Sequence, residues 1–297
     1  MRELGRVRGD APGPTLIVVG GMHGNEPEGV AAAEKMLQAA QARGLGAGEV
    51  IALEANTAAL AAGRRYLVRD LNRVWSDDSL AAARARLARG ERDAETHSQV
   101  ALADVLDAAI AGARGSIYAL DLHTSSSAGI PFTILGSSAA DRGFAARFPL
   151  PGIVGLQERL DGVLTRHLVH RGCVALAIVG GRSGTASAAQ SLADVALLAL
   201  VATGLASPPD APEAAARLAA IRGCLPALIE VVHRHEVTPA RRFVMEPGLL
   251  NIQRVAENTL LAKEQGEDVR APFDGYVLLP LYQPQGQDGF FFGRAAS

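Results

Sequence analysis

The sequence Thr15-Leu16-Ile17-Val18-Val19 predicts a buried β-strand, and it runs directly into the glycine-rich turn Gly20-Gly21-Met22-His23-Gly24-Asn25-Glu26. An alanine-rich helix is expected next, over about 27–42. Strands and helices then alternate along the chain, with strands expected at 49–53, 116–122, 132–135 and 174–178 and helices at about 79–90, 95–112, 155–171 and 186–203. This alternation favours an α/β fold, in which helices cover both faces of a mostly parallel mixed sheet.

The last third of the chain changes character after a proline-rich segment. Three prolines fall within residues 208–212, and a helix is expected over 213–222. Beyond it the sequence predicts strands at 228–232 and 242–245 and a further strand within 271–279. We therefore predict three parts: an α/β domain over 1–204, a linker and helix over 205–226, and a small C-terminal β-domain over 227–297.

Composition narrows the class of protein. The 297 residues carry a net charge of −2 without a long basic run, which argues against nucleic-acid binding. The first residues lack the apolar core of a signal peptide, and the longest apolar run, 195–202, is too short to span a bilayer. Cys173 and Cys224 form no Cys-x-x-Cys pair and suit a reducing compartment. We expect a cytoplasmic protein with no membrane or nucleic-acid partner, and a homo-oligomer is left open.

Two segments carry side chains that suit a metal. His23 and Glu26 are three residues apart on the first turn, and His123 follows the apolar run 116–122. Each alone is commonly structural. Because the carboxyl ends of parallel strands meet at one edge of a sheet, all three are expected to converge there. Three protein ligands with a fourth position left open are typical of catalytic zinc.

A third segment is rich in arginine. Residues 64–73 hold four arginines, an aspartate and an asparagine, within Arg64-Arg65-Tyr66-Leu67-Val68-Arg69-Asp70-Leu71-Asn72-Arg73-Val74-Trp75. Such a cluster is commonly a solvated loop. An arginine fork also matches a carboxylate, however, so the segment favours a site for a substrate that carries one.

Together these motifs resemble the succinylglutamate desuccinylase/aspartoacylase family, which is related to the zinc carboxypeptidases. The shared pattern is His-x-x-Glu, then Asp-x-Asn-Arg, then a distant histidine after a strand. The resemblance implies a zinc carboxypeptidase-like fold, a Zn²⁺ cofactor, and hydrolysis of the amide bond of an N-acyl amino acid or a related small carboxylated amide. It also implies the site: His23, Glu26 and His123 as zinc ligands, Arg65 on the scissile carbonyl, Asn72 and Arg73 on the substrate carboxylate, and Tyr282 closing over the substrate.

One position departs from the family pattern. Relatives place a glutamate after a strand, before a pair of glycines, where it accepts a proton from the attacking water. Here the matching stretch is Ala175-Leu176-Ala177-Ile178-Val179-Gly180-Gly181, and Val179 stands at the position of the glutamate. A valine cannot accept a proton, and a positioned general base contributes about 10²–10⁴-fold to the rate. A weakened hydrolase is therefore expected.

Two alternatives remain open. The chain is a zinc-containing binding protein for a carboxylated ligand if the missing base abolishes turnover. A rival metal group is His233 with His235, since alternate residues of a strand share one face and Glu230 or Glu236 stands close in sequence. No third ligand on a suitable turn accompanies this pair, so a structural role or a place at the rim of the substrate site is favoured.

Overall fold

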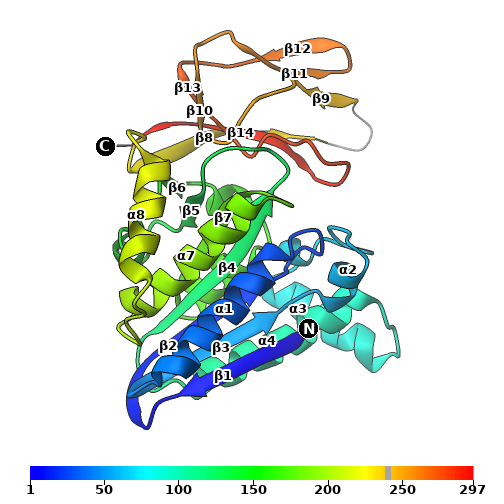
Figure 1. The fold of residues 1–297 in the computed structure, drawn as a ribbon. Helices are drawn as coiled ribbons and strands as arrows, with labels where there is room; N and C mark the ends of the chain where they lie inside the picture. Colours follow the sequence, from blue (N-terminus) through cyan, green and yellow to red (C-terminus); the bar gives the residue numbers. More distant parts are fainter. Residues whose placement is uncertain (238–241, 297) are drawn as a thin grey trace.

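The computed structural model describes residues 1–237 and 242–296. Its main sheet has 11 strands in the order β1-β3-β2-β4-β7-β5-β6-β8-β14-β13-β10, and a smaller sheet has the order β12-β11-β9 (Figure 1). The strands of the main sheet are β1 Arg2–Arg8, β2 Ala11–Gly20, β3 Ala47–Glu54, β4 Ile117–Ser125, β5 Phe132–Leu135, β6 Gly152–Val154, β7 Val174–Arg182, β8 Leu228–Glu236, β10 Gln253–Val255, β13 Gly275–Leu278 and β14 Asp288–Ala295. Those of the small sheet are β9 Phe243–Met245, β11 Leu260–Glu264 and β12 Glu267–Arg270.

The centre of the main sheet is parallel. Strand β2 pairs in parallel with β3 and β4, and β4 pairs in parallel with β7. Strands β1 and β5 run antiparallel to their neighbours β3 and β7, so the sheet is mixed. The register places His123 opposite Val179, and Gly20 opposite Leu122. The turn after β2 and the end of β4 therefore lie at the same edge of the sheet.

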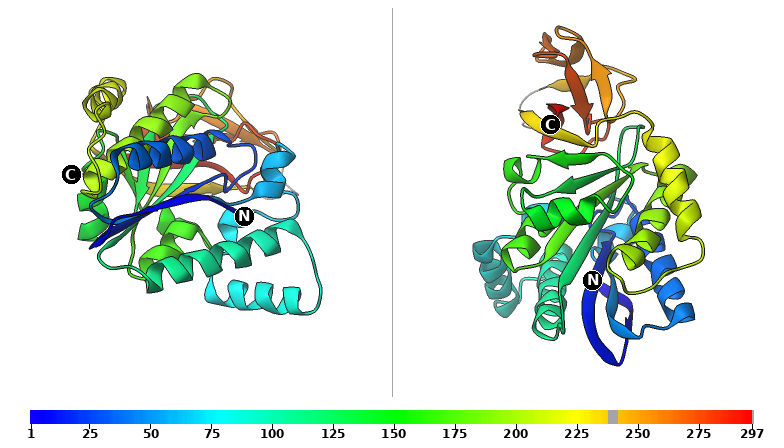
Figure 2. Two further views of the ribbon diagram at one scale, coloured as in Figure 1. Left: turned by 60° about the horizontal axis from the view of Figure 1, so that its bottom comes forward. Right: turned by 90° about the vertical axis from the view of Figure 1, so that its left-hand side faces the viewer.

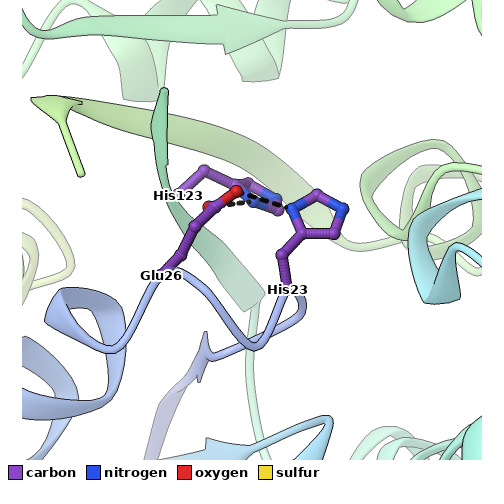
Figure 3. A group of neighbouring side chains, drawn as sticks. All are labelled: His23, Glu26 and His123. Carbon is purple, nitrogen blue, oxygen red and sulfur yellow. Dashed lines mark hydrogen bonds and ion pairs between the residues drawn. The ribbon is translucent and has the colours of Figure 1, made fainter. Parts of the chain in front are cut away.

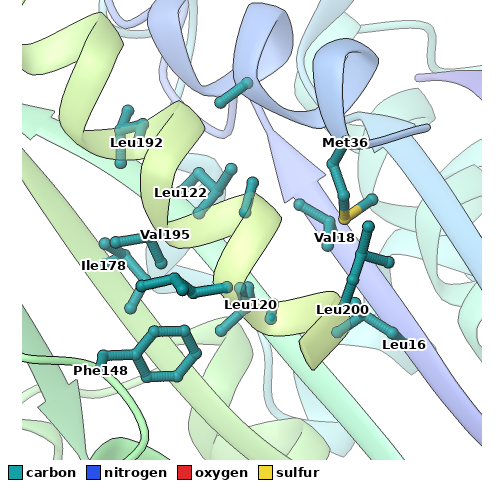
Figure 4. Close-up of a cluster of buried hydrophobic side chains, with 14 of the residues drawn as sticks. Leu16, Val18, Met36, Leu120, Leu122, Phe148, Ile178, Leu192, Val195 and Leu200 are labelled. Carbon is teal, nitrogen blue, oxygen red and sulfur yellow. The ribbon is translucent and has the colours of Figure 1, made fainter. Parts of the chain in front are cut away.

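Helices cover both faces of this sheet, which confirms the predicted fold class (Figure 2). Helices α1, α7 and α8 pack on one face through the apolar cluster that Figure 4 shows in part. Helices α4 and α6 pack on the other face, around Leu102 and Leu168. The helices are α1 Glu28–Arg43, α2 Thr57–Ala61, α3 Asp77–Ala88, α4 Ala94–Ala111, α5 Ala139–Ala145, α6 Leu164–His170, α7 Ala186–Ala202 and α8 Ala211–Arg222, with 3-10 helices η1 Leu71–Arg73 and η2 Gln157–Arg159.

One predicted helix is wrong. Instead of a helix over 155–171, the chain forms a loop that contains η2 and then the short helix α6. Gly155 and Gly162 adopt φ angles of 79° and 64°, which a right-handed helix excludes. A side chain at Gly162 would collide with the backbone carbonyl of Arg73, so this glycine lets the loop pack against η1. The same loop forms one wall of the site described below.

The C-terminal strands continue the main sheet. Strand β8 pairs in parallel with β6, and β14, β13 and β10 extend the sheet beyond it with antiparallel pairings. The helix predicted after the proline-rich segment is α8, which docks on α7 through an ion pair between Arg217 and Asp194 at 2.7 Å. The predicted domain boundaries stay a prediction. Within residues 1–237 and 242–296, every helix is too short or too polar to cross a membrane.

Candidate metal and substrate site

Three predicted ligands converge at the edge of the sheet. His23 and Glu26 lie on the turn after β2, and His123 lies near the end of β4 (Figure 3). The Glu26 carboxylate stands between the two imidazole rings, with Oε1 2.8 Å from His23 Nδ1 and Oε2 3.1 Å from His123 Nδ1. The three residues are only 4, 3 and 7 % exposed. One ligand atom from each lies within 4.8 Å of the others, so this group could hold a metal ion.

Two aspartates orient the histidine rings. His23 Nε2 lies 3.1 Å from Asp70 Oδ1, and His123 Nε2 lies 2.9 Å from Asp121 Oδ2. In each ring Nε2 thus faces an aspartate and Nδ1 faces Glu26, so a hydrogen kept on Nε2 would leave Nδ1 to bind a metal. This is the arrangement that supports metal-ligating histidines in proteins. The residues present therefore fit a metal bound by two nitrogens and one carboxylate oxygen.

The electrostatics of the group also suit a cation. Burial raises the pKa of Glu26, but His23 and His123 outweigh this effect and hold the pKa below its ordinary value. Burial alone would lower the pKa of His123. The neighbouring carboxylates of Asp121 and Glu26 have the larger effect and raise this pKa to about 10. Without a metal, a proton on His123 therefore balances two buried carboxylates. A metal cation would take the place of that positive charge.

The arginine segment lies beside this group. Arg65 donates from Nε and Nη2 to Asp70 Oδ2 at 3.2 and 3.0 Å, and its Nη1 lies 3.5 Å from Glu26 Oε1. Asp70 thus joins His23 to Arg65. Glu95, which the sequence reading overlooked, accepts hydrogen bonds from the backbone N–H groups of Leu67 and Val68 at 2.8 and 3.0 Å. Glu95 is fully buried on α4 and fixes the loop that carries Arg65.

The residues predicted to bind a carboxylate have internal partners. Asn72 Oδ1 accepts from the Leu164 N–H at 2.9 Å, and its Nδ2 lies 3.3 Å from His123 Nε2. Arg73 donates from Nη2 to Asp288 Oδ2 at 3.0 Å, across 215 residues of sequence. Asp288 also accepts from Arg234 Nε at 2.7 Å. Arg73 therefore faces the site while paired with a carboxylate of β14.

Tyr282 is placed differently from the other predicted site residues. Its hydroxyl donates to the Glu246 carbonyl at 2.6 Å and accepts from the Leu249 N–H at 3.0 Å. Its neighbours Leu281 and Gln283 line the outer cavity described next, but Tyr282 is not among the described lining residues. Its assignment to the substrate stays a prediction.

Two adjoining cavities open over the group. An inner cavity of about 120 Å³ is lined by His23, Glu26 and His123 and by Val179 of β7. An outer cavity of about 380 Å³ lies between the arginine segment and residues 279–291. Both cavities share lining residues, which form the passage between them: Arg65, Arg73, Thr124, Leu160 and Leu279. Among the described residues that line the inner cavity, Glu26 is the only carboxylate.

The rival histidines lie elsewhere. The His235 ring stacks on Phe290 with centroids 5.0 Å apart, and the His233 ring lies 6.3 Å from that of His235. In the part of the chain that the structure describes, His23, Glu26 and His123 are the one group of three such side chains with converging ligand atoms. The structure thus brings together the first metal group but not the second.

Known proteins match this chain in sequence and in fold. A family model described as the succinylglutamate desuccinylase/aspartoacylase catalytic domain matches residues 12–144. No curated protein matches the chain. A succinylglutamate desuccinylase from Chromobacterium violaceum is 19% identical with a TM-score of 0.68, over 98% of this chain and 88% of that one.

Two further solved structures have the same fold. A succinylglutamate desuccinylase/aspartoacylase from Rhodobacter sphaeroides is 18% identical with a TM-score of 0.68, over 98% of this chain and 87% of the other. The ectoine utilization protein EutE (DoeB) from Ruegeria pomeroyi, in a product-bound structure, is 18% identical with a TM-score of 0.65 and the same coverage.

Proposed function

The chain belongs to the succinylglutamate desuccinylase/aspartoacylase family, and on this premise we propose that it is a zinc-dependent deacylase. Its substrate is an N-acyl amino acid or a related small carboxylated amide, and the bond cleaved is the amide bond. The observation that carries the proposal is the buried group of His23, Glu26 and His123, oriented by two aspartates and open to a cavity.

Each residue has a role in this proposal. When bound, zinc supplies Lewis acidity to the scissile carbonyl and lowers the pKa of the attacking water. Arg65 stands beside Glu26, where its Nη1 can donate to the carbonyl oxygen as negative charge develops on it. Arg73 lies on the passage between the cavities, where it can meet a substrate carboxylate. Asp70 and Asp121 hold the imidazole rings throughout.

One observation supports a second candidate function. Val179 lines the inner cavity next to His123, its register partner on the neighbouring strand, so the Val179 side chain provides no proton acceptor there. A protein with this wall but an intact metal group would bind an acylated ligand and turn it over slowly or not at all. The second candidate is therefore a zinc-containing binding protein for a carboxylated ligand.

Metal analysis combined with a substrate screen tests both. The purified protein is assayed for zinc and then offered a panel of N-acyl amino acids, with release of free amine as the readout. We expect about one zinc per chain and slow hydrolysis. Binding without amine release would support the second candidate, and a protein without zinc or ligand binding would contradict both.

A further inference from the structure

We propose that the inner cavity receives an uncharged aliphatic group of the substrate and excludes a second carboxylate. This inference rests on the proposed function and deepens it, because it names the chemical class of one half of the substrate. The apolar residues that line this cavity together with the metal group carry the argument.

These residues form an apolar wall over several elements. It is formed by the side chains of Ile134 on β5, of Ala177 and Val179 on β7, and of Leu156, Leu160 and Val163 on the loop before α6. All six are buried in one cluster that also contains Phe132 and Phe291. Because these side chains pack against the apolar cluster behind them, the wall cannot turn a polar group toward the ligand without disturbing the core.

The cations near the cavity are already balanced. Arg65 pairs with Asp70 and lies close to Glu26, and Arg73 pairs with Asp288, as described above. The substrate carboxylate expected at the outer cavity can still meet Arg73 at the passage. Away from the metal ligands, a second carboxylate that passed inward would lose its water, and both arginines of the described lining already have carboxylate partners.

The other polar groups of the lining are neutral. They are the side chains of Gln157, Thr165, Thr124 and Asn72. The Gln157 Nε2 is buried and has no hydrogen-bond partner within residues 1–237 and 242–296. One neutral amide donor compensates an ion poorly compared with a guanidinium fork, so Gln157 does not make the cavity a site for an anion.

Substrate pairs of equal shape test the proposal on the zinc-loaded protein. N-acetyl-leucine is compared with N-acetyl-aspartate. The side chain of the amino acid ends in a branched aliphatic group in the first compound and in a carboxylate in the second. N-isovaleryl-glycine is compared with N-malonyl-glycine, which differ in the same way on the acyl side. We expect the aliphatic member of at least one pair to have the higher kcat/KM, by about 10-fold or more. The proposal would be overturned if neither pair showed a higher kcat/KM for its aliphatic member. This covers equal values in both pairs as well as a preference for the carboxylated member.

A wall variant sharpens the result. Leu160→Arg places a cation at the junction of the two cavities, on a loop and not in the sheet. We expect it to shift the preference toward the carboxylated member by about 10-fold or more, since charged hydrogen bonds are strong. Leu160→Met is the matched control and should keep the wild-type preference. If Leu160→Arg fails to fold, the wild-type comparison still decides.

Binding separates this proposal from the proposed activity. Isothermal calorimetry with the same four amides needs no turnover and is also run on the metal-free protein. If the aliphatic member of a pair binds more tightly but is not hydrolysed, the cavity assignment is upheld and the proposed deacylase activity is contradicted. Tighter binding of the carboxylated member, or no binding of any of the four, would overturn the cavity assignment whatever the activity.

Discussion

The residues that line the inner cavity fall into two groups that differ in polarity and charge. On the side of β2 and β4, His23, Glu26 and His123 converge, and Asp70 and Asp121 hold both rings. On β7, the register partner of His123 is Val179, which belongs to an apolar cluster. In the proposed function, holding a metal and moving a proton would therefore be separate tasks of separate strands. Changing one side should therefore leave the other intact.

The largest expected effect is on the metal side. His123→Ala should reduce the zinc content from about one per chain to almost none, because it removes one of three protein ligands and leaves Asp121 without its partner. Elemental analysis after dialysis measures this directly. His97→Ala, at an exposed position on α4, is the control and should keep its zinc. Equal zinc in the His123 variant and the wild type would show that the metal site is assigned wrongly.

The next effect is on the β7 side. Val179→Glu should raise kcat on a suitable N-acyl amino acid by about 10²-fold, because it places a general base in the inner cavity next to His123. Burial should raise the pKa of the new carboxyl and bring it closer to neutrality. Steady-state kinetics at one pH, with zinc content checked, provide the measurement.

Val179→Gln is the matched control for this variant. It has nearly the same shape as the glutamate but cannot accept a proton, so it should gain nothing. Two results would contradict the comparison: a fast wild-type enzyme, which means that another residue supplies the base, or a folded, zinc-loaded Val179→Glu protein without any gain.

The convergence of His23, Glu26 and His123 could be predicted from the sequence because the information for it is local. A strand followed by a glycine-rich turn with His23 and Glu26, and a second strand ending at His123, suffice to place three ligands at one edge of a parallel sheet. Asp121 was also within reach, since it lies two residues before His123 and hence on the same face of the strand. Its role was overlooked because the residue lies within an apolar run.

Other parts of the site depend on contacts that no local pattern reveals. Asp288 meets Arg73 from 215 residues away, after the chain has passed through the whole C-terminal part. The wall loop was misread as a helix because its apolar spacing resembles one, whereas Gly155 and Gly162 turn the chain. Glu95 lies at the start of a predicted helix and has no distinguishing motif around it, but the backbone of the arginine segment donates hydrogen bonds to it.

A smaller effect concerns the passage between the cavities. Arg73→Ala should raise KM for a carboxylated substrate by about 10–100-fold, the value of a charged hydrogen bond, and hardly change KM for a neutral amide. Asp288→Asn should act in the opposite direction and lower KM for the carboxylated substrate, because Arg73 loses a competing carboxylate. Asp268→Asn, in an exposed ion pair of the small sheet, is the control. Equal effects of Arg73→Ala on both substrates would exclude a carboxylate-specific role.

The smallest effect is expected at Tyr282, outside both walls. The family resemblance assigns this residue to the substrate, whereas its hydroxyl is engaged with the backbone of residues 246 and 249. Tyr282→Phe removes these hydrogen bonds and should lower the free energy of unfolding by about 1 kcal/mol, as measured by urea denaturation. KM should stay unchanged, because the hydroxyl would first have to leave both partners to reach a ligand. A rise in KM without loss of stability would show that Tyr282 moves onto the substrate. The substrate would then contact the C-terminal part of the chain in addition to the two groups of residues that line the inner cavity.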